Sequence, residues 1–147
     1  MNWIVASMHG AAVTSIAVGK NVGVAPDAKV VYYSAVNVTN NPEEIEAYRT
    51  RVEQVIEANK DDPDSVKMLQ DSISSMVDEF GRCVSNKPYV EAINKILDDN
   101  EKLPEKERVS VIFISWGFDE YASGYEDLQQ AIQRAKKTRR IYCIHKN

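Results

Sequence analysis

His9 is the residue whose surroundings best suit proton transfer. It stands in the stretch HGAAVTSIAVG, ahead of small and apolar residues that recur at helical spacing. An imidazole at the start of a helix is held in a fixed orientation, as a catalytic histidine must be. The other interpretation is a histidine that opens a helix with its hydrogen bonds satisfied. The helical positions that follow it are Ala12, Val13, Ile16 and Ala17.

The two cysteines, Cys83 and Cys143, are too few for a disulfide framework and match no paired zinc spacing. We expect both to be buried, reduced thiols. Cys143 lies in the apolar stretch RIYCI, where a thiol stays protonated and inert. Nothing in the sequence calls for a metal or another cofactor.

The composition is that of a soluble globular protein. The chain has 147 residues, which suggests one domain, and its net charge of -4 is spread along the sequence. No basic patch indicates nucleic acid, and no apolar run is long enough to span a bilayer. The N-terminus lacks the order of a secretion signal, so we expect no membrane association and a cytoplasmic location for the chain as written.

Two segments alternate helix and strand. Residues 9–36 read as a helix, a turn at GVAPDA and a strand at KVVYYSAV. Residues 109–147 read as a strand at VSVIFIS that is buried on both faces, a loop at WGFDEYASG, a helix and a strand at RIYCI. This alternation predicts an α/β domain with about three parallel strands in one sheet. The apolar face of the second helix consists of Leu128, Ala131, Ile132 and Ala135.

Residues 40–104, between these segments, read as entirely helical. The first helix begins at Asn41 and Pro42, the second at Asp62 and Pro63, and the third near Pro88. We expect the second helix to end at Gly81 and the third at Leu103 and Pro104. The charged residues on the outer faces are expected to be solvated. The predicted inward residues are Ile45, Tyr48, Val52, Val55 and Ile56 in the first helix, Val66, Leu69, Ile73, Met76, Val77 and Phe80 in the second, and Tyr89, Ile93, Ile96 and Leu97 in the third.

The run HGAAVTSIAVG followed by VGVAPDAKV resembles the histidine motif of subtilisin-like serine peptidases. The family form is HGT, a variable residue, V and two small residues, followed after a loop by GVAP and a strand. The resemblance implies a partial subtilisin-like sheet and makes His9 the general base. It extends over residues 8–36 and 86–147, so that residues 41–81 look like a helical insertion into a single partial domain of residues 1–147.

The second half of the chain continues the resemblance. VIFISWGF looks like the family strand that ends in serine, a variable residue and glycine, whose edge pairs with an extended substrate. This implies substrate binding by Ser115, Trp116 and Gly117, whereas the alternative is an ordinary turn after a buried strand. Asn147 falls on the position of the family asparagine that donates to the oxyanion. Coincidence at a frayed end is the other explanation for Asn147.

The family triad is incomplete in this sequence. The eight residues before His9 contain no acid, and no serine lies in a GTSxAxP context. Losing the orienting carboxylate alone costs about four orders of magnitude in rate, and losing the nucleophile removes the acyl-enzyme route. Ala11 also replaces the usual hydroxyl residue after HG. We therefore expect no useful hydrolysis by this chain alone.

The sequence is compatible with three functional hypotheses. The chain is a truncated subtilisin-like peptidase, or a non-catalytic peptide- or protein-binding module derived from one. In the third hypothesis, the chain is a different enzyme in which Cys143 or His145 acts beside His9. An isolated section of parallel sheet exposes edges and apolar faces, so we also expect self-association or a complementing chain as partner, besides an extended peptide or protein substrate.

Overall fold

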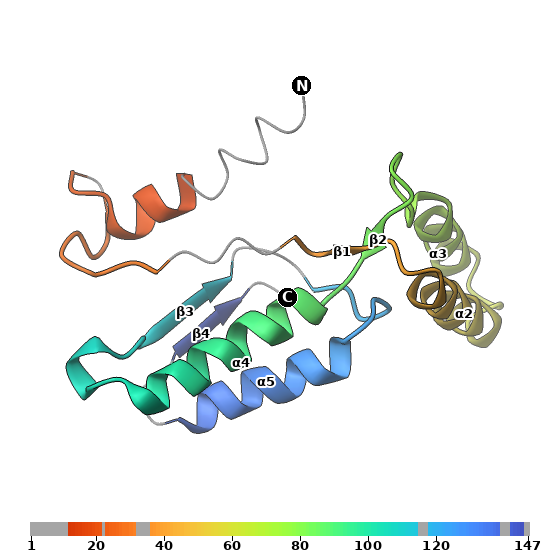
Figure 1. Ribbon diagram of the computed structural model, residues 1–147. Helices are drawn as coiled ribbons and strands as arrows, with labels where there is room; N and C mark the ends of the chain where they lie inside the picture. The colour runs from red at the N-terminus through yellow and green to blue at the C-terminus, as the bar shows by residue number, and fades with distance from the viewer. Residues whose placement is uncertain (1–11, 22, 32–35, 115–117, 139–141, 146–147) are drawn as a thin grey trace. The chain divides into compact units, whose positions relative to one another are not determined.

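The computed structural model describes residues 12–21, 23–31, 36–114, 118–138 and 142–145 (Figure 1). Contacts divide the chain into two compact units, Met1–Ser34 and Ala35–Asn147. The described residues mix helices and strands, which confirms the α/β class. Among the described residues, no helix is both long enough and apolar enough to span a membrane.

In the first unit, residues 12–18 form the helix that the HGAAV stretch predicts. The helix closes through Gly19 N–H, which donates to Ser15 O at 2.8 Å, and a second turn follows where Gly23 N–H donates to Gly19 O at 2.7 Å. The predicted strand of residues 29–36 is not observed. Residues 29–31 and 36 are not in a strand, and residues 32–35 lie outside the described residues.

The described residues of the second unit form two small sheets instead of the predicted three-stranded parallel one. Strands β1 (Val38–Thr39) and β2 (Cys83–Val84) pair antiparallel. Strands β3 (Val111–Ile114) and β4 (Tyr142–His145) pair parallel, in a register that places Val111 opposite Tyr142. The crossover between β3 and β4 contains helix α5 (Tyr125–Lys137), as predicted. The prediction that this strand is buried on both faces is wrong, because Val111 of β3 is exposed.

The starts of the two insertion helices agree with the sequence. Helix α2 (Pro42–Ala58) is capped by Asn41, whose side chain accepts from Glu43 N–H at 2.9 Å. Helix α3 (Pro63–Ser75) is capped by Asp62, whose side chain accepts from the N–H groups of Asp64 and Ser65. Each cap satisfies backbone donors that a helix start leaves unpaired.

The predicted end of the second helix at Gly81 is wrong, and residues 40–104 are not all helical. Helix α3 stops at Ser75, and a tight turn follows in which Asp78 accepts from Phe80 N–H and Arg82 N–H. The turn leads into β2 and leaves Val77 36% and Phe80 70% exposed, although both were expected inside. Local side-chain hydrogen bonding therefore overrode the continuing apolar stripe.

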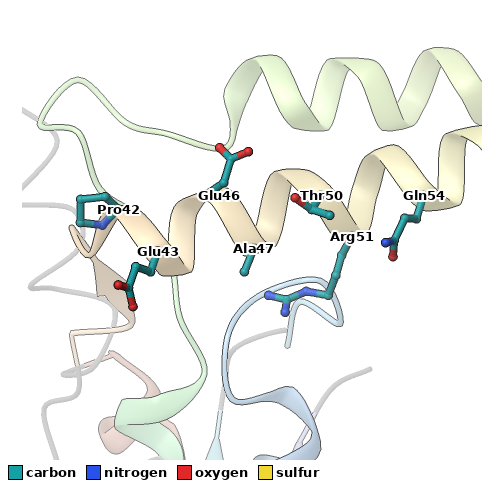
Figure 2. A pocket seen from close by; sticks show the side chains of 7 residues that line it. All are labelled: Pro42, Glu43, Glu46, Ala47, Thr50, Arg51 and Gln54. Atoms are coloured by element: carbon teal, nitrogen blue, oxygen red, sulfur yellow. The ribbon is translucent and has the colours of Figure 1, made fainter.

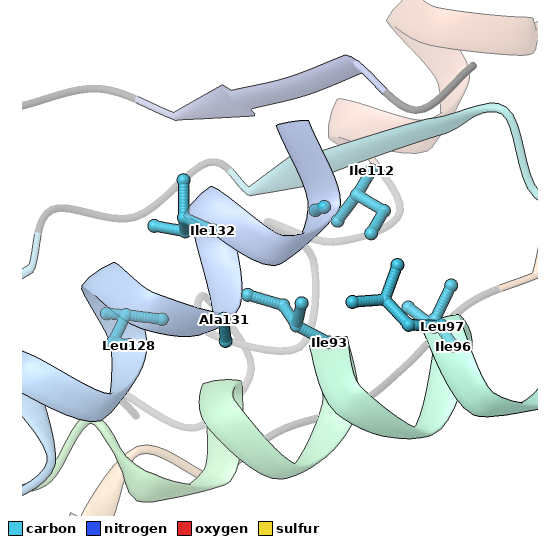
Figure 3. Close-up of a cluster of buried hydrophobic side chains, with 8 residues drawn as sticks. Ile93, Ile96, Leu97, Ile112, Leu128, Ala131 and Ile132 are labelled. Carbon is cyan, nitrogen blue, oxygen red and sulfur yellow. The ribbon is translucent and has the colours of Figure 1, made fainter. Parts of the chain in front are cut away.

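Helix α4 (Lys87–Lys102) and α5 lie side by side against β3 and β4 (Figure 1). A short 3₁₀ turn, Glu105–Glu107, joins α4 to β3. Figure 3 shows the main core, where α4, α5 and β3 contribute aliphatic side chains. All four residues predicted for the inner face of α5 are buried. This core contains Ile93, Ile96, Leu97, Ile112, Leu128, Ala131, Ile132 and Ala135.

A second core joins the insertion helices to β2. It differs from the first in including a residue from the loop after β3, Ala122, which is 2% exposed. The loop therefore packs against the insertion helices, in addition to linking β3 to α5. The members of this core are Tyr48, Val52, Leu69, Met76, Cys83 and Ala122.

The main core yields a stability prediction. Replacing Leu128, which is fully buried, by alanine leaves a cavity among α4, α5 and β3. We expect Leu128→Ala to lower the free energy of unfolding by about 2–5 kcal/mol, measured by urea denaturation. Met68→Ala on the exposed face of α3 is the control and should stay within about 0.5 kcal/mol of the parent. Equal losses in both variants would contradict this assignment of the core.

Candidate functional site

The residues that the sequence singles out lie outside the described residues. The structure describes their neighbours: the helix of residues 12–18, strand β3 ending at Ile114, and strand β4 ending at His145. The residues concerned are His9, Ser115, Trp116, Gly117 and Asn147.

The loop that follows β3, residues 118–124, is fixed by the buried start of α4. Asn86 is 1% exposed, and its side-chain amide donates to Asp119 O at 2.8 Å. Its backbone N–H donates to Ser123 O at 2.8 Å. Gly124 ends the loop at a φ of 78°, and an added Cβ would lie 2.9 Å from Lys87 Cγ. Glycine thus allows the starts of α4 and α5 to approach closely.

Helix α2 holds the same loop from the other side. Tyr48 Oη donates to Asp119 Oδ2 at 2.8 Å, and Arg51 Nε donates to Tyr121 O at 2.7 Å. Figure 2 shows the Arg51 side chain extending from α2 toward this loop. Arg51 Nη2 is buried and has no hydrogen-bond partner among the described residues. The contact between α2 and the loop is therefore close enough to exclude water from part of a guanidinium group.

A third contact between α2 and the loop involves Glu44. Its Oε2 accepts from Ser123 Oγ at 2.5 Å and its Oε1 from Lys87 Nζ at 2.7 Å. Ser123 Oγ also lies 2.9 Å from the Oγ of the buried Ser85. The hydrogen bonds from Lys87 and Ser123 hold the pKa of Glu44 below its usual range. Glu44 was expected on a solvated face, but its side chain is only 15% exposed.

The surroundings of Asp119 favour neutral or positive groups. Burial, followed by the hydrogen bond to Asp119, raises the pKa of Tyr48. Burial also raises the pKa of Tyr121, with further contributions from the neighbouring Glu120 and Asp119. For Cys83, burial is again the main cause of the raised pKa, and the Asp119 charge adds to it. A negative charge would be costly at this position.

Two hollows accompany these contacts. The larger is an open groove of about 910 Å³ that runs between the helix pair α2–α3 and helix α5. Phe118, Asp119, Glu120 and Tyr121 belong to its wall, directly after the Ser115–Gly117 segment. The smaller, about 610 Å³, is lined only by side chains of α2 (Figure 2), so it is a depression on one helix rather than a cleft.

Asn86, Tyr48, Arg51 and Glu44 together clamp the loop of residues 118–124, and this clamp was not predicted from the sequence. Glu44 was expected on a solvated helix face, and Ser123 lies 79 positions away along the chain. No periodicity or short motif connects residues at that separation. The aspartate and aromatic residues of FDEY were a usable signal, since polar and aromatic residues in a loop after a buried strand are typical of binding sites.

Neither a metal site nor a known relative assigns a function. Within the described ranges, no group of three or more His, Cys, Asp and Glu residues could hold a metal ion. Cys83 is a buried, reduced thiol as expected, whereas the Cys143 side chain lies outside the described part. No family model, no curated protein and no solved structure matches this chain.

The Glu44 contacts predict a pH-dependent stability. Because the folded pKa of Glu44 is lowered, its contribution is present above the ordinary glutamate pKa and is lost as the pH falls through the folded value. We expect Glu44→Gln to reduce the free energy of unfolding by about 1–3 kcal/mol at pH 7 and by much less near pH 3. Urea denaturation at both pH values measures this, with Glu53→Gln as the exposed control. A loss of equal size at both values would contradict the role of the Glu44 charge.

The environment of Cys83 predicts low thiol reactivity. Burial and the Asp119 charge both disfavour its thiolate, which is the reactive form. Native protein treated with iodoacetamide at pH 8 should leave Cys83 unmodified for as long as the fold persists, as judged by peptide mass spectrometry. Protein unfolded in urea is the control and should be modified fully. Rapid modification in the native state would show that β2 is not held in the second core.

Proposed function

We propose that this chain is a segment of a subtilisin-like serine peptidase, a class of enzyme that hydrolyses peptide bonds. The observation that carries the proposal is the run HGAAVTSIAVG followed by VGVAPDAKV, with its histidine, small residues and GVAP turn at the family spacing. A bare His-Gly pair would carry little weight, but the joint occurrence of these features over 21 residues, 9–29, is specific.

Three described features support the proposal. Residues 12–18 of the histidine motif form a helix, as the motif requires. Gly23 of the GVAP turn packs so close to the backbone of Gly19 that a Cβ would collide with it, so this turn needs glycine. Strands β3 and β4 are parallel and are joined through α5. On this proposal they are neighbouring strands of a partial subtilisin-like sheet.

The proposal assigns one role to each candidate residue. His9 is the general base, and Asn147 donates its amide to the developing oxyanion. Ser115, Trp116 and Gly117 form the edge that pairs with an extended peptide. The sequence supplies neither the orienting aspartate nor the serine nucleophile, so a polypeptide of this sequence needs a complementing chain for hydrolysis.

A second candidate function is non-catalytic peptide binding on the same edge. The clamp on residues 118–124 favours it, because Asn86, Tyr48 and Glu44 hold the continuation of that edge in place. A loop that is already held in place loses little conformational entropy when a peptide binds beside it. Binding therefore does not depend on the missing triad members, whereas cleavage does.

Peptide binding and cleavage can be tested together. We expect a polypeptide of this sequence to leave an extended chromogenic peptide uncut while binding it by backbone pairing, measured by fluorescence anisotropy. Methylating the two peptide nitrogens that face the edge removes two hydrogen bonds and should weaken binding by about tenfold or more. Methylating the two that face away is the control.

The outcomes separate the hypotheses. Equal affinities of the two methylated peptides would eliminate edge pairing. Cleavage that survives His9→Ala would eliminate the general-base assignment. Cleavage abolished by His9→Ala would instead show that the incomplete triad suffices, against our expectation.

A further inference from the structure

We infer that the groove between the helix pair α2–α3 and helix α5 binds an extended peptide that presents an arginine side chain to Asp119 and Glu120. The inference does not depend on the proposed kinship, because the residues that carry it all belong to the described part of the second unit. It concerns a surface lined mainly by residues 118–121 and helix α5, to which the insertion adds Tyr48 and Ser72, and it is separate from backbone pairing at Ser115–Gly117.

The dimensions of the groove suit a short extended peptide. Its volume of about 910 Å³ is within the range of small-molecule and peptide sites. One wall follows α5 from Tyr125 to Lys136. Eleven helical steps of about 1.5 Å give this wall a length of roughly 16 Å, which is the length of about five extended residues.

One end of the groove is both aromatic and acidic. The rings of Tyr48 and Tyr121 are 6.4 Å apart in an edge-to-face arrangement, and Tyr125 is the next aromatic residue of the lining. Beside them are the carboxylates of Asp119 and Glu120. In the described part of the chain, the donors to the Asp119 carboxylate are the neutral groups Tyr48 Oη and Tyr121 N–H. Among the described residues, no cation forms an ion pair with either carboxylate.

An arginine side chain matches this end of the groove. Its planar cation stacks on aromatic rings and pairs with carboxylates, and burial of the rings strengthens both attractions. Burial is the main cause of the raised pKa values of Tyr48 and Tyr121, and the nearby carboxylates add to it. An acidic or neutral side chain would leave both carboxylates uncompensated.

The rest of the groove suits the backbone and the far end of the peptide. Gln129 and Gln133 are exposed on the same face of α5, one helical turn apart, and each offers donors and an acceptor. Lys136 closes the groove at the other end and has no ion-pair partner in the described ranges. An acidic side chain about five residues from the arginine would reach it.

The probes are dye-labelled hexapeptides, and binding to the full chain is measured by fluorescence anisotropy. The first has arginine at one end, glutamate at the other and alanine between them, and the second has the same ends exchanged, because the direction of the peptide is open. The control peptide carries glutamine at both ends. We expect saturable binding of one charged peptide and at least fivefold weaker binding of the control.

Protein variants locate the site. Glu120→Gln and Lys136→Gln should each weaken binding by about two- to fivefold, as expected for exposed ion pairs. Each should lose its effect with a peptide whose matching charge is replaced by glutamine. Glu53→Gln, an exposed carboxylate of α2 that does not line the groove, is the matched control and should not change the affinity.

Three results would overturn the inference. The first is the absence of saturable binding, and the second is binding that neither Glu120→Gln nor Lys136→Gln changes. The third is concentration-dependent self-association of the parent chain that Tyr125→Ala abolishes, which would make a second copy the occupant of the groove. The hexapeptide test depends on side-chain charge, whereas the test with methylated peptides depends on backbone pairing. A negative result in either test therefore leaves the result of the other unaffected.

Discussion

The hydrogen bonds of Asn86 hold the second unit together. This side chain is almost fully buried, and the residue binds the loop after β3 at two points, Asp119 O and Ser123 O. The loop thereby connects the two hydrophobic cores, because its Phe118 packs against the main core and its Ala122 belongs to the second. A buried amide left without hydrogen-bond partners lowers the stability of the fold by about 1–3 kcal/mol. These hydrogen bonds therefore favour the observed path of the loop.

The insertion helices add to this constraint through residues far away in sequence. Tyr48, Arg51 and Glu44 contact the loop across 71, 70 and 79 positions. The entropy of closing such long loops grows only slowly with length, so a few charge-assisted and buried hydrogen bonds can offset it. The insertion is consequently part of the fold of this unit, and not an appendage to it. Its removal would expose one side of residues 118–124 to water.

Local signals in the sequence were sufficient for the helices. Asn41 and Asp62 cap their helices through bonds within three residues, and the apolar spacing of α5 gives its buried face directly. The error at Phe80 arose because two local signals disagreed, and the Asp78 turn prevailed over the apolar stripe. Strands β1 and β2 were missed because two residues are too few to show a period.

The candidate site was less accessible to sequence reasoning, for a physical reason. A motif such as HGAAV records which residues stand close together in the chain, whereas the clamp and the groove depend on contacts that only the folded chain creates. Asp119 illustrates the difference. One carboxylate oxygen accepts from a tyrosine of the insertion and the other from the backbone of its own loop, so its orientation is fixed while its charge stays unpaired among the described residues. An oriented carboxylate beside aromatic rings is prepared for a cation before any ligand arrives, and this reduces the entropy that binding must overcome.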